Sequence, residues 1–325
     1  MLGIHARSIV HSVERVKGQH EVGGEWSRLR QKLPTTVVPE PLRLQHMSLE
    51  ESLFAVPIGL IGGLFGGMLG IGGSVVMIPL LDLTQGPNQQ LYQASAMVAN
   101  VCSALSGSLK HRGRGTIRSD LTSVMLPLAA VGAIAGVLTS NEMQPTPLRA
   151  IFGGFLFLTA LLEFSGALRH KSQNEEQHTG ALQGTRLKCG AVALCGGVVS
   201  GLLGVGGGVL MVPMMRSLLG MPLRQSIATA SVVMLASTSV GAVAKNATIT
   251  SLQDSHGIPL TLAQSMSLAL PLATAALIGA AIGASISYRL PLRGLKLVFA
   301  TLIGFAGVRM LLQALAEFQT MNAAS

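Results

Sequence analysis

The sequence predicts an all-α, polytopic membrane protein. Of its 325 residues, 49% are hydrophobic and 11% are charged, whereas a soluble globular chain carries about 25% charged residues. An outer-membrane barrel is excluded because only 4% of the residues are aromatic, 39 are glycine, and no alternating strand pattern with aromatic girdles is present. Helices remain as the structure that can cross the lipid.

Eight apolar segments follow residue 50, and a spanning helix needs about 20 apolar residues. The segments cover residues 53–83, 90–109, 121–140, 147–168, 187–219, 223–244, 260–286 and 292–315. Six of them have the ordinary length of a single crossing. The first and the fifth exceed 30 residues and are interrupted by glycine clusters, so we expect these two segments to be broken or re-entrant.

The chain contains an internal repeat. Residues 62–81 align with residues 196–215 at an offset of 134, with ten identities in twenty positions. The same offset aligns three pairs in the following segment: Ser95 with Thr229, Ser103 with Ser237, and Gly107 with Gly241. After an insertion near residues 247–260, an offset of 144 aligns Pro127 with Pro271.

We therefore predict two homologous four-segment repeats. The first covers residues 51–170 and the second residues 186–318, with a hydrophilic linker at 171–185. A polar tail at 1–50 precedes the repeats, and a short C-terminal tail at 319–325 follows them. The first tail has no apolar region of the kind that a signal peptide needs, although an organelle-targeting segment is left open.

The glycine clusters indicate where the chemistry lies. They comprise Gly70, Gly72 and Gly73, followed by Ser74, in the first repeat, and Gly204, Gly206, Gly207 and Gly208 in the second. Each glycine costs a helix about 1 kcal/mol relative to alanine, so such a cluster should break the helix. The half-helix that follows would present free N–H groups and a positive dipole end, which favours an anion.

A second glycine pattern has a different interpretation. Gly59, Gly63 and Gly67 recur every four residues and therefore lie on one face of a helix. Stripes of this kind let two membrane helices pack closely. We predict that these three glycines form a packing surface.

Residues 62–81 and 196–215, together with the Ala-Ser/Thr-Ala segments that follow them, resemble the TauE/SafE sulfite exporter family, also called the toluene-sulfonate uptake permeases. The resemblance covers about residues 51–316. It implies a secondary transporter for sulfite, organosulfonates or related small anions. The first repeat has Ser74 where the second has Gly208, so the two anion-facing ends need not be equivalent.

The second and sixth segments supply further candidate substrate-binding side chains: Ser95, Asn100, Ser103, Thr229 and Ser237. Hydroxyls in membrane helices often bond a neighbouring carbonyl instead, and this alternative stays open for each of them. Asn100 can donate two hydrogen bonds to an oxyanion.

Charged residues are scarce within the apolar segments. Asp82 and Glu163 lie near segment ends, and we expect both to snorkel to the surface. Lys245 falls in the loop after residue 244. Cys102 is interpreted as a small packed hydrophobe. The pattern shows no metal-binding spacing, no catalytic constellation and no nucleotide motif, so we predict no metal, no cofactor and no enzymatic activity.

The net charge of +9 belongs to the membrane surface, because the basic residues lie in the tail and beside apolar segments. We expect a small anionic substrate and the lipid bilayer as partners, and no nucleic acid. A homodimer is left open. The expected location is the cell membrane, as a multi-pass protein.

Two alternatives stay open at this point. The substrate could be another anion such as a carboxylate, carried by a transporter or a channel, and a membrane-embedded enzyme is the least favoured function. The repeats could be parallel, with eight crossings, or inverted, with three crossings each. We favour inverted repeats because the loop with Arg216 and Arg224 and the loop with Arg289, Arg293 and Lys296 then both lie inside, while the loop with only Lys245 lies outside.

Overall fold

The structure is a computed structural model that describes residues 49–112, 117–168, 185–254, 258–286 and 292–324. The polar tail before residue 49 and most of the predicted linker lie outside the described residues. The described part is helical apart from one isolated β-bridge between Gln253 and Pro259. The predicted all-α, polytopic class is therefore confirmed.

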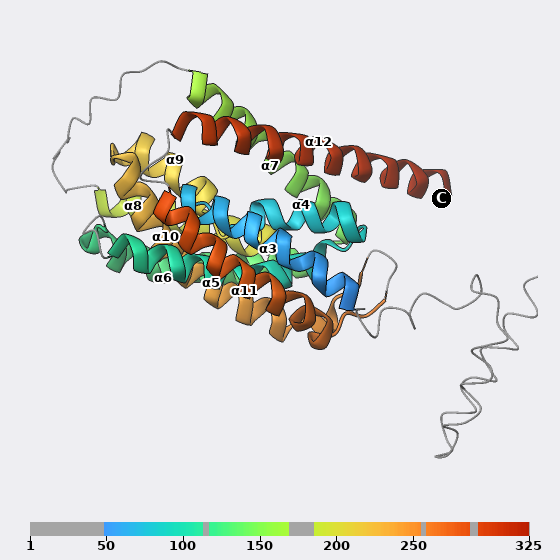
Figure 1. The fold of residues 1–325 in the computed structure, drawn as a ribbon. Helices are drawn as coiled ribbons and strands as arrows, with labels where there is room; N and C mark the ends of the chain where they lie inside the picture. Colours follow the sequence, from blue (N-terminus) through green and yellow to red (C-terminus); the bar gives the residue numbers. More distant parts are fainter. Residues whose placement is uncertain (1–48, 113–116, 169–184, 255–257, 287–291, 325) are drawn as a thin grey trace, which may run out of the picture. The chain divides into compact units, whose positions relative to one another are not determined.

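Ten α-helices and one 3₁₀ turn are described (Figure 1). They are α3 (Leu49–Leu69), α4 (Ser74–Gln85), α5 (Gln89–Arg112), α6 (Ser119–Glu142), α7 (Pro145–Leu168), α8 (Thr185–Leu203), α9 (Gly208–Leu219), α10 (Leu223–Ala247), η2 (Ile249–Ser251), α11 (Leu262–Ile286) and α12 (Leu292–Ala324). Each of the two long predicted segments is divided into two helices, α3 with α4 and α8 with α9.

Six of the described helices are long and apolar enough to cross a membrane: α6, α7, α8, α10, α11 and α12. Helix α5 is 24 residues long but less apolar, because it carries several buried polar side chains such as Gln89, Gln93 and Asn100. A polar helix is tolerated at membrane depth where protein surrounds it. The protein is thus an integral, multi-pass membrane protein.

Close backbone packing joins α3 to α11. A Cβ added to Gly59 would lie 2.5 Å from the carbonyl oxygen of Leu272, and Gly63 and Gly67 meet Ala276 and Ala280 in the same way. The predicted packing role of this glycine stripe is confirmed. Helix α8 packs on α6 in the same manner, where Gly197 and Gly201 meet the carbonyls of Ala129 and Ala133.

Helices α7 and α12 pack chiefly on each other and lie side by side in Figure 1. Among the described helices, their further substantial contacts are those of α12 with α4 and of α7 with α5. Helices α5 and α10 pack together, and each also contacts a helix of the other predicted repeat, α11 and α6 respectively. Helix α4 therefore packs on α3, α5 and α12, and helix α9 packs on α8 and α10.

Candidate functional site

The first glycine cluster separates α3 from α4. Gly72 has a φ of 90°, a left-handed conformation that glycine adopts without the penalty a Cβ would impose. The chain then folds back, so that α4 lies against α3. The close approach is seen at Gly62 of α3, where an added Cβ would lie 2.5 Å from Cγ of Met77 in α4. Helix α4 therefore returns along α3 instead of continuing its direction.

The second cluster separates α8 from α9 in a similar way. Gly206 and Gly207 have φ values of 78° and 74°, and a Cβ on Gly196 of α8 would collide with Met211 of α9. The two breaks are not identical, because Gly73, which aligns with Gly207, has a right-handed φ of −73°.

The two breaks touch each other, although 134 positions separate them in the chain. A Cβ on Gly72 would lie 2.7 Å from the carbonyl oxygen of Val205. A Cβ on Gly208 would collide with the carbonyl oxygen of Gly70. The structure thus brings together the two clusters that the sequence predicted as binding elements.

Asn100 of α5 joins the breaks through one amide group. Its Oδ1 accepts a hydrogen bond from the backbone N–H of Ser74 at 3.1 Å. Its Nδ2 donates to Oγ of Ser74 at 2.5 Å and to the carbonyl of Gly204 at 3.3 Å. The side chain is fully buried, so Asn100 caps α4 and at the same time holds the second break.

Met234 of α10 lies against both breaks. Its Sδ would be 2.8 Å from a Cβ on Gly206 and 3.2 Å from a Cβ on Gly72. The offset of 134 aligns Met234 with Asn100. The meeting point therefore has a polar amide from one repeat and an apolar thioether from the other.

The predicted hydroxyls lie in different surroundings. Ser95 donates to the carbonyl of Ser265 at 3.1 Å, at the start of α11. Thr229 accepts from the backbone N–H of Arg118 at 3.4 Å, at the start of α6. Ser237 donates within its own helix, to the carbonyl of Met234 at 3.1 Å. These three contacts join or stabilise helices.

Ser103 is the exception among the predicted hydroxyls. It is 2% exposed, and within the described part of the chain its Oγ has no hydrogen-bond partner. It lies one helical turn after Asn100 on α5. Its hydroxyl is therefore available for a further polar partner.

The amides at the start of α4 and α9 also differ. The N–H of Ser74 is bonded by Asn100. Among the bonds formed by the described residues, none is donated by the N–H of Gly208 or Val209. The first turn of α9 thus offers two free N–H donors at the positive end of its dipole, whereas that of α4 offers the N–H of Val75 among the described bonds.

Comparison with known proteins decides the family. Residues 55–310 match the family described as "Sulfite exporter TauE/SafE". The chain belongs to this family. The resemblance predicted from the glycine motifs is thereby confirmed, and it extends over both clusters and the helices that surround them.

Curated relatives are named as probable membrane transporter proteins. YunE of Bacillus subtilis is 26% identical over 58% of this chain and 76% of its own length. MJ0441 of Methanocaldococcus jannaschii is 24% identical over 78% of this chain and 93% of its own. MamO of Paramagnetospirillum magneticum is 24% identical over 79% of this chain, which spans 44% of that protein. No solved structure gives a significant match.

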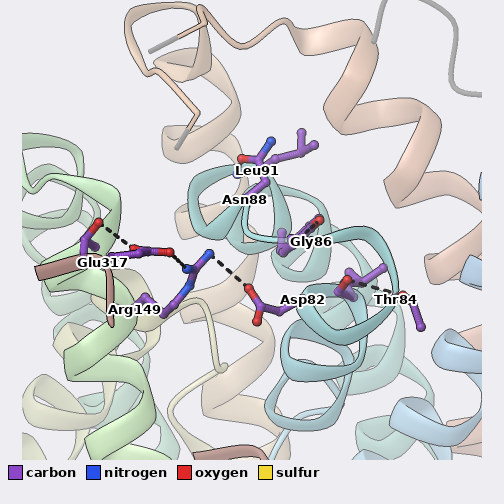
Figure 2. A network of polar contacts seen from close by, with 10 residues as sticks. Asp82, Thr84, Gly86, Asn88, Leu91, Arg149 and Glu317 are labelled. Atoms are coloured by element: carbon purple, nitrogen blue, oxygen red, sulfur yellow. Dashed lines mark hydrogen bonds and ion pairs between the residues drawn. The ribbon is translucent and has the colours of Figure 1, made fainter. Parts of the chain in front are cut away.

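Buried charges cluster around the last turn of α4 in this TauE/SafE protein (Figure 2). Nη2 of Arg149 in α7 is 3.2 Å from Oδ1 of Asp82 in α4, and both side chains are almost fully buried. Arg149 also pairs with Glu317 of α12, and Thr146 donates to Glu317 at 2.8 Å. The expectation that Asp82 snorkels was wrong, because Asp82 is 3% exposed and finds its counter-ion inside the protein.

Lys245 is a second buried charge. The prediction that it lies in a loop was wrong, because α10 continues to Ala247 and Lys245 is 0% exposed. Its Nζ donates to Oδ1 of Asn141 at 2.8 Å, to Oγ of Ser140 at 2.7 Å, and to Oε1 of Gln90. Three acceptors from α5 and α6 match the three protons of an ammonium group.

A narrow recess lies beside the first break, on the side of α9. It is lined by Leu69, Ile71, Glu163, Val212, Leu223, Ile227 and Phe299. Glu163 of α7 is half-buried there. Among the described residues, no group of three or more His, Cys, Asp or Glu side chains could hold a metal ion.

Sequence reasoning did not single out Met234 or Arg149. Met234 is apolar, and its only signal is that the repeat offset aligns it with Asn100. Arg149 lies near the predicted start of a segment and therefore resembles an ordinary interfacial charge. Its pairing with Asp82 and Glu317 depends on helices that are far apart in the chain.

Proposed function

We propose that the protein is a secondary transporter of small sulfur-containing anions, such as sulfite or an organosulfonate, that bind between the two glycine breaks near mid-membrane. The observation that carries the proposal is the direct contact of the two breaks, which Asn100 joins. Broken helices at membrane depth are typical of the substrate sites of secondary transporters. The family's description, which names sulfite export, supports the substrate class.

The polar groups at this point suit an anion. The unbonded amides of Gly208 and Val209 begin α9, where the helix dipole amounts to about half a positive charge. The amide of Asn100 can exchange its bond to Gly204, at 3.3 Å the longest of its three, for an oxyanion. Binding would then depend on N–H donors, because no Arg or Lys touches the breaks among the described contacts.

The asymmetry of the site favours an anion with two different ends. Asn100 supplies a polar surface and Met234 an apolar, polarisable one, and both touch Gly72 and Gly206. A sulfonate with a short carbon chain would place its oxygens toward Asn100 and its carbon toward Met234. The same chemistry would also accept a small carboxylate, which stays the alternative substrate class.

We further propose that the two repeats are inverted. The two repeats pack in an equivalent way, because the exchange of equivalent helices converts the α3–α11 contact into the α8–α6 contact. Both broken segments fold back, which leaves α5, α6, α7 and their counterparts α10, α11 and α12 as three crossings per repeat. In this arrangement the basic residues Arg112, Arg118, Lys188, Arg216 and Arg224 lie on one face, which the positive-inside rule makes cytoplasmic.

The test is counterflow of labelled sulfite and sulfoacetate in proteoliposomes. A carrier exchanges the label, a channel only equilibrates it, and an enzyme changes the compound. We expect exchange by the wild type, and a loss of about tenfold or more for Asn100→Asp, because a buried charge would repel the anion and lose its bond to Gly204. Gln319→Glu makes the same chemical change at an exposed position of α12 and serves as the control.

Two results would contradict the proposal. Equal exchange by the Asn100→Asp and Gln319→Glu proteins would mean that Asn100 takes no part in substrate binding. Exchange of carboxylates but of no sulfur compound would contradict the proposed substrate class. The proposed transporter function would then still hold.

A further inference from the structure

One face of α5 carries a file of four polar side chains: Gln89, Gln93, Asn100 and Ser103. Their spacing places them on the same face of an α-helix. Each of them is at most 2% exposed. The part of the file from Gln89 to Asn100 is about 17 Å long, at about 1.5 Å rise per residue. It therefore extends from the beginning of α5 to the contact between the glycine breaks.

This polar file has more polar atoms than hydrogen-bond partners. Among the bonds formed by the described residues, neither end of the Gln89 amide has a partner, and Oε1 of Gln93 and Oγ of Ser103 have none either. Nε2 of Gln93 donates to the carbonyl of Leu202 at 3.2 Å. A buried polar group without a bond costs free energy, and such groups are rare in native proteins. The structure therefore shows the file in a closed state that leaves much of its bonding capacity unused.

Gln93 lies beside the proposed substrate site. A Cβ added to Gly204 would be 3.2 Å from both Cβ and Cγ of Gln93, and the carbonyl of Gly204 accepts a hydrogen bond from Asn100. Two amides of α5 therefore hold the end of α8 and the second break. Helices α5 and α8 otherwise share little packing surface among the described helices. Few contacts oppose a separation of α5 from the end of α8.

The second repeat is apolar at the equivalent positions. The offset of 134 aligns Gln89 with Leu223 and Gln93 with Ile227. Ile227 occupies the equivalent place in the fold, because a Cβ added to Gly70 would be 2.6 Å from its Cγ2. An apolar side chain therefore fits this place, and packing alone does not require the two amides of the first repeat.

We infer that Gln89 and Gln93 form a second anion subsite, which lies between Asn100 and the membrane face at which α5 begins. When α5 separates from the end of α8, the N–H groups of both amides gain the oxygens of a small oxyanion such as a sulfonate as acceptors. The bonds that are missing in the closed state are then formed, which favours the open state. Uncharged donors bind the anion weakly enough to release it again. The inference rests on the proposed transport between the two breaks.

The first test is Gln89→Leu, which removes no described hydrogen bond and introduces the side chain that the second repeat has at this position. We expect sulfoacetate counterflow to fall about tenfold, the equivalent of one lost hydrogen bond to an anion. The unfolding temperature should equal that of the wild type or exceed it, because an unbonded amide is removed from the interior. A residue with only a packing role would not lower exchange without lowering stability.

The control for this test is Gln319→Leu, which makes the same change at an exposed position of α12 and should leave exchange unchanged. A folded Gln89→Leu protein that exchanges sulfoacetate as fast as the Gln319→Leu protein would overturn the inference.

The second test measures accessibility and needs no transport. Gln93→Cys and Ala94→Cys are compared in a background without the three native cysteines. Both positions are 0% exposed, but Ala94 packs against Ile249 and Leu252. A methanethiosulfonate reagent that carries a sulfonate group is applied from each face of the membrane. We expect Gln93→Cys to react about tenfold faster than Ala94→Cys, from the face at which α5 begins, and sulfoacetate to slow the reaction.

If Gln93→Cys fails to fold, Gln89→Cys takes its place. Equal rates at the file position and at Ala94, or a reaction only from the face at which α5 ends, would overturn the inference. A reaction that sulfoacetate does not slow would mean that only water enters the file, which also contradicts an anion subsite. A wild type without counterflow would contradict the proposed function, whereas protection by sulfoacetate would still support the subsite, so the two failures are distinct.

Discussion

A single added methyl group at Gly206 tests whether the contact between the breaks supports the fold and transport. In Gly206→Ala the new Cβ would lie 2.8 Å from Sδ of Met234 and 3.2 Å from Nδ2 of Asn100. The residue would also have to keep a φ of 78°, a conformation that costs an L-residue about 1–2 kcal/mol.

Overpacking adds about 1–3 kcal/mol in a well-packed interior. The end of Met234 is flexible and can move, whereas Asn100 is held by three hydrogen bonds. We therefore take the lower half of the overpacking range and expect a total cost of about 2–4 kcal/mol. In a protein of this size that lowers the unfolding temperature by roughly 3–6 °C.

The assay is thermal unfolding of the detergent-solubilised protein, followed by counterflow in proteoliposomes. The control is Gly154→Ala, because Gly154 lies within α7 and a Cβ there would meet nothing within 4 Å. We expect the control to exchange substrate like the wild type and to unfold at the same temperature or slightly above it, because alanine favours a helix more than glycine does. If Gly206→Ala unfolded at the same temperature as Gly154→Ala and exchanged substrate equally well, the described contact between the breaks would be incorrect.

Three further predictions concern other parts of the chain. Met234→Asn should lower sulfoacetate exchange relative to sulfite exchange by about tenfold, because it replaces the apolar surface of the site; an unchanged ratio would remove Met234 from the site. Lys245→Met should lower the unfolding temperature relative to the exposed control Lys110→Met, because each buried acceptor left without a partner costs about 1–3 kcal/mol; equal temperatures would contradict the described bonds of Lys245. Cysteines at the exposed positions Arg112 and Gly294 should be labelled from the same face of the membrane if the repeats are inverted; labelling from opposite faces would eliminate that arrangement.

Local sequence patterns were sufficient to predict part of the architecture. The scarcity of charge and the length of the apolar segments determine a helical membrane protein. The density of glycine at Gly70–Gly73 and Gly204–Gly208 predicts where helices end, because the backbone cost of glycine acts on the residue itself. The four-residue spacing of Gly59, Gly63 and Gly67 likewise predicts a packing face, although it does not name α11 as the partner.

The buried charges could not be placed in this way. Asp82 and Lys245 lie near the ends of apolar segments, where snorkelling or a loop position is the ordinary expectation. Their burial depends on partners from other helices, namely Arg149 and Glu317 for Asp82, and Gln90, Ser140 and Asn141 for Lys245. A spacing rule along one helix contains no information about such partners.

The sequence by itself determined the membrane class, the helical segments, the two glycine breaks and the family, because each of these depends on residues that are neighbours in the chain. Only the tertiary structure decided that the breaks touch, that Asn100 joins them, that Met234 lies opposite Asn100, and that Asp82 meets Arg149. Each of these contacts brings together residues from helices far apart in the sequence. Packing selects such contacts from many pairings that the local pattern permits equally well.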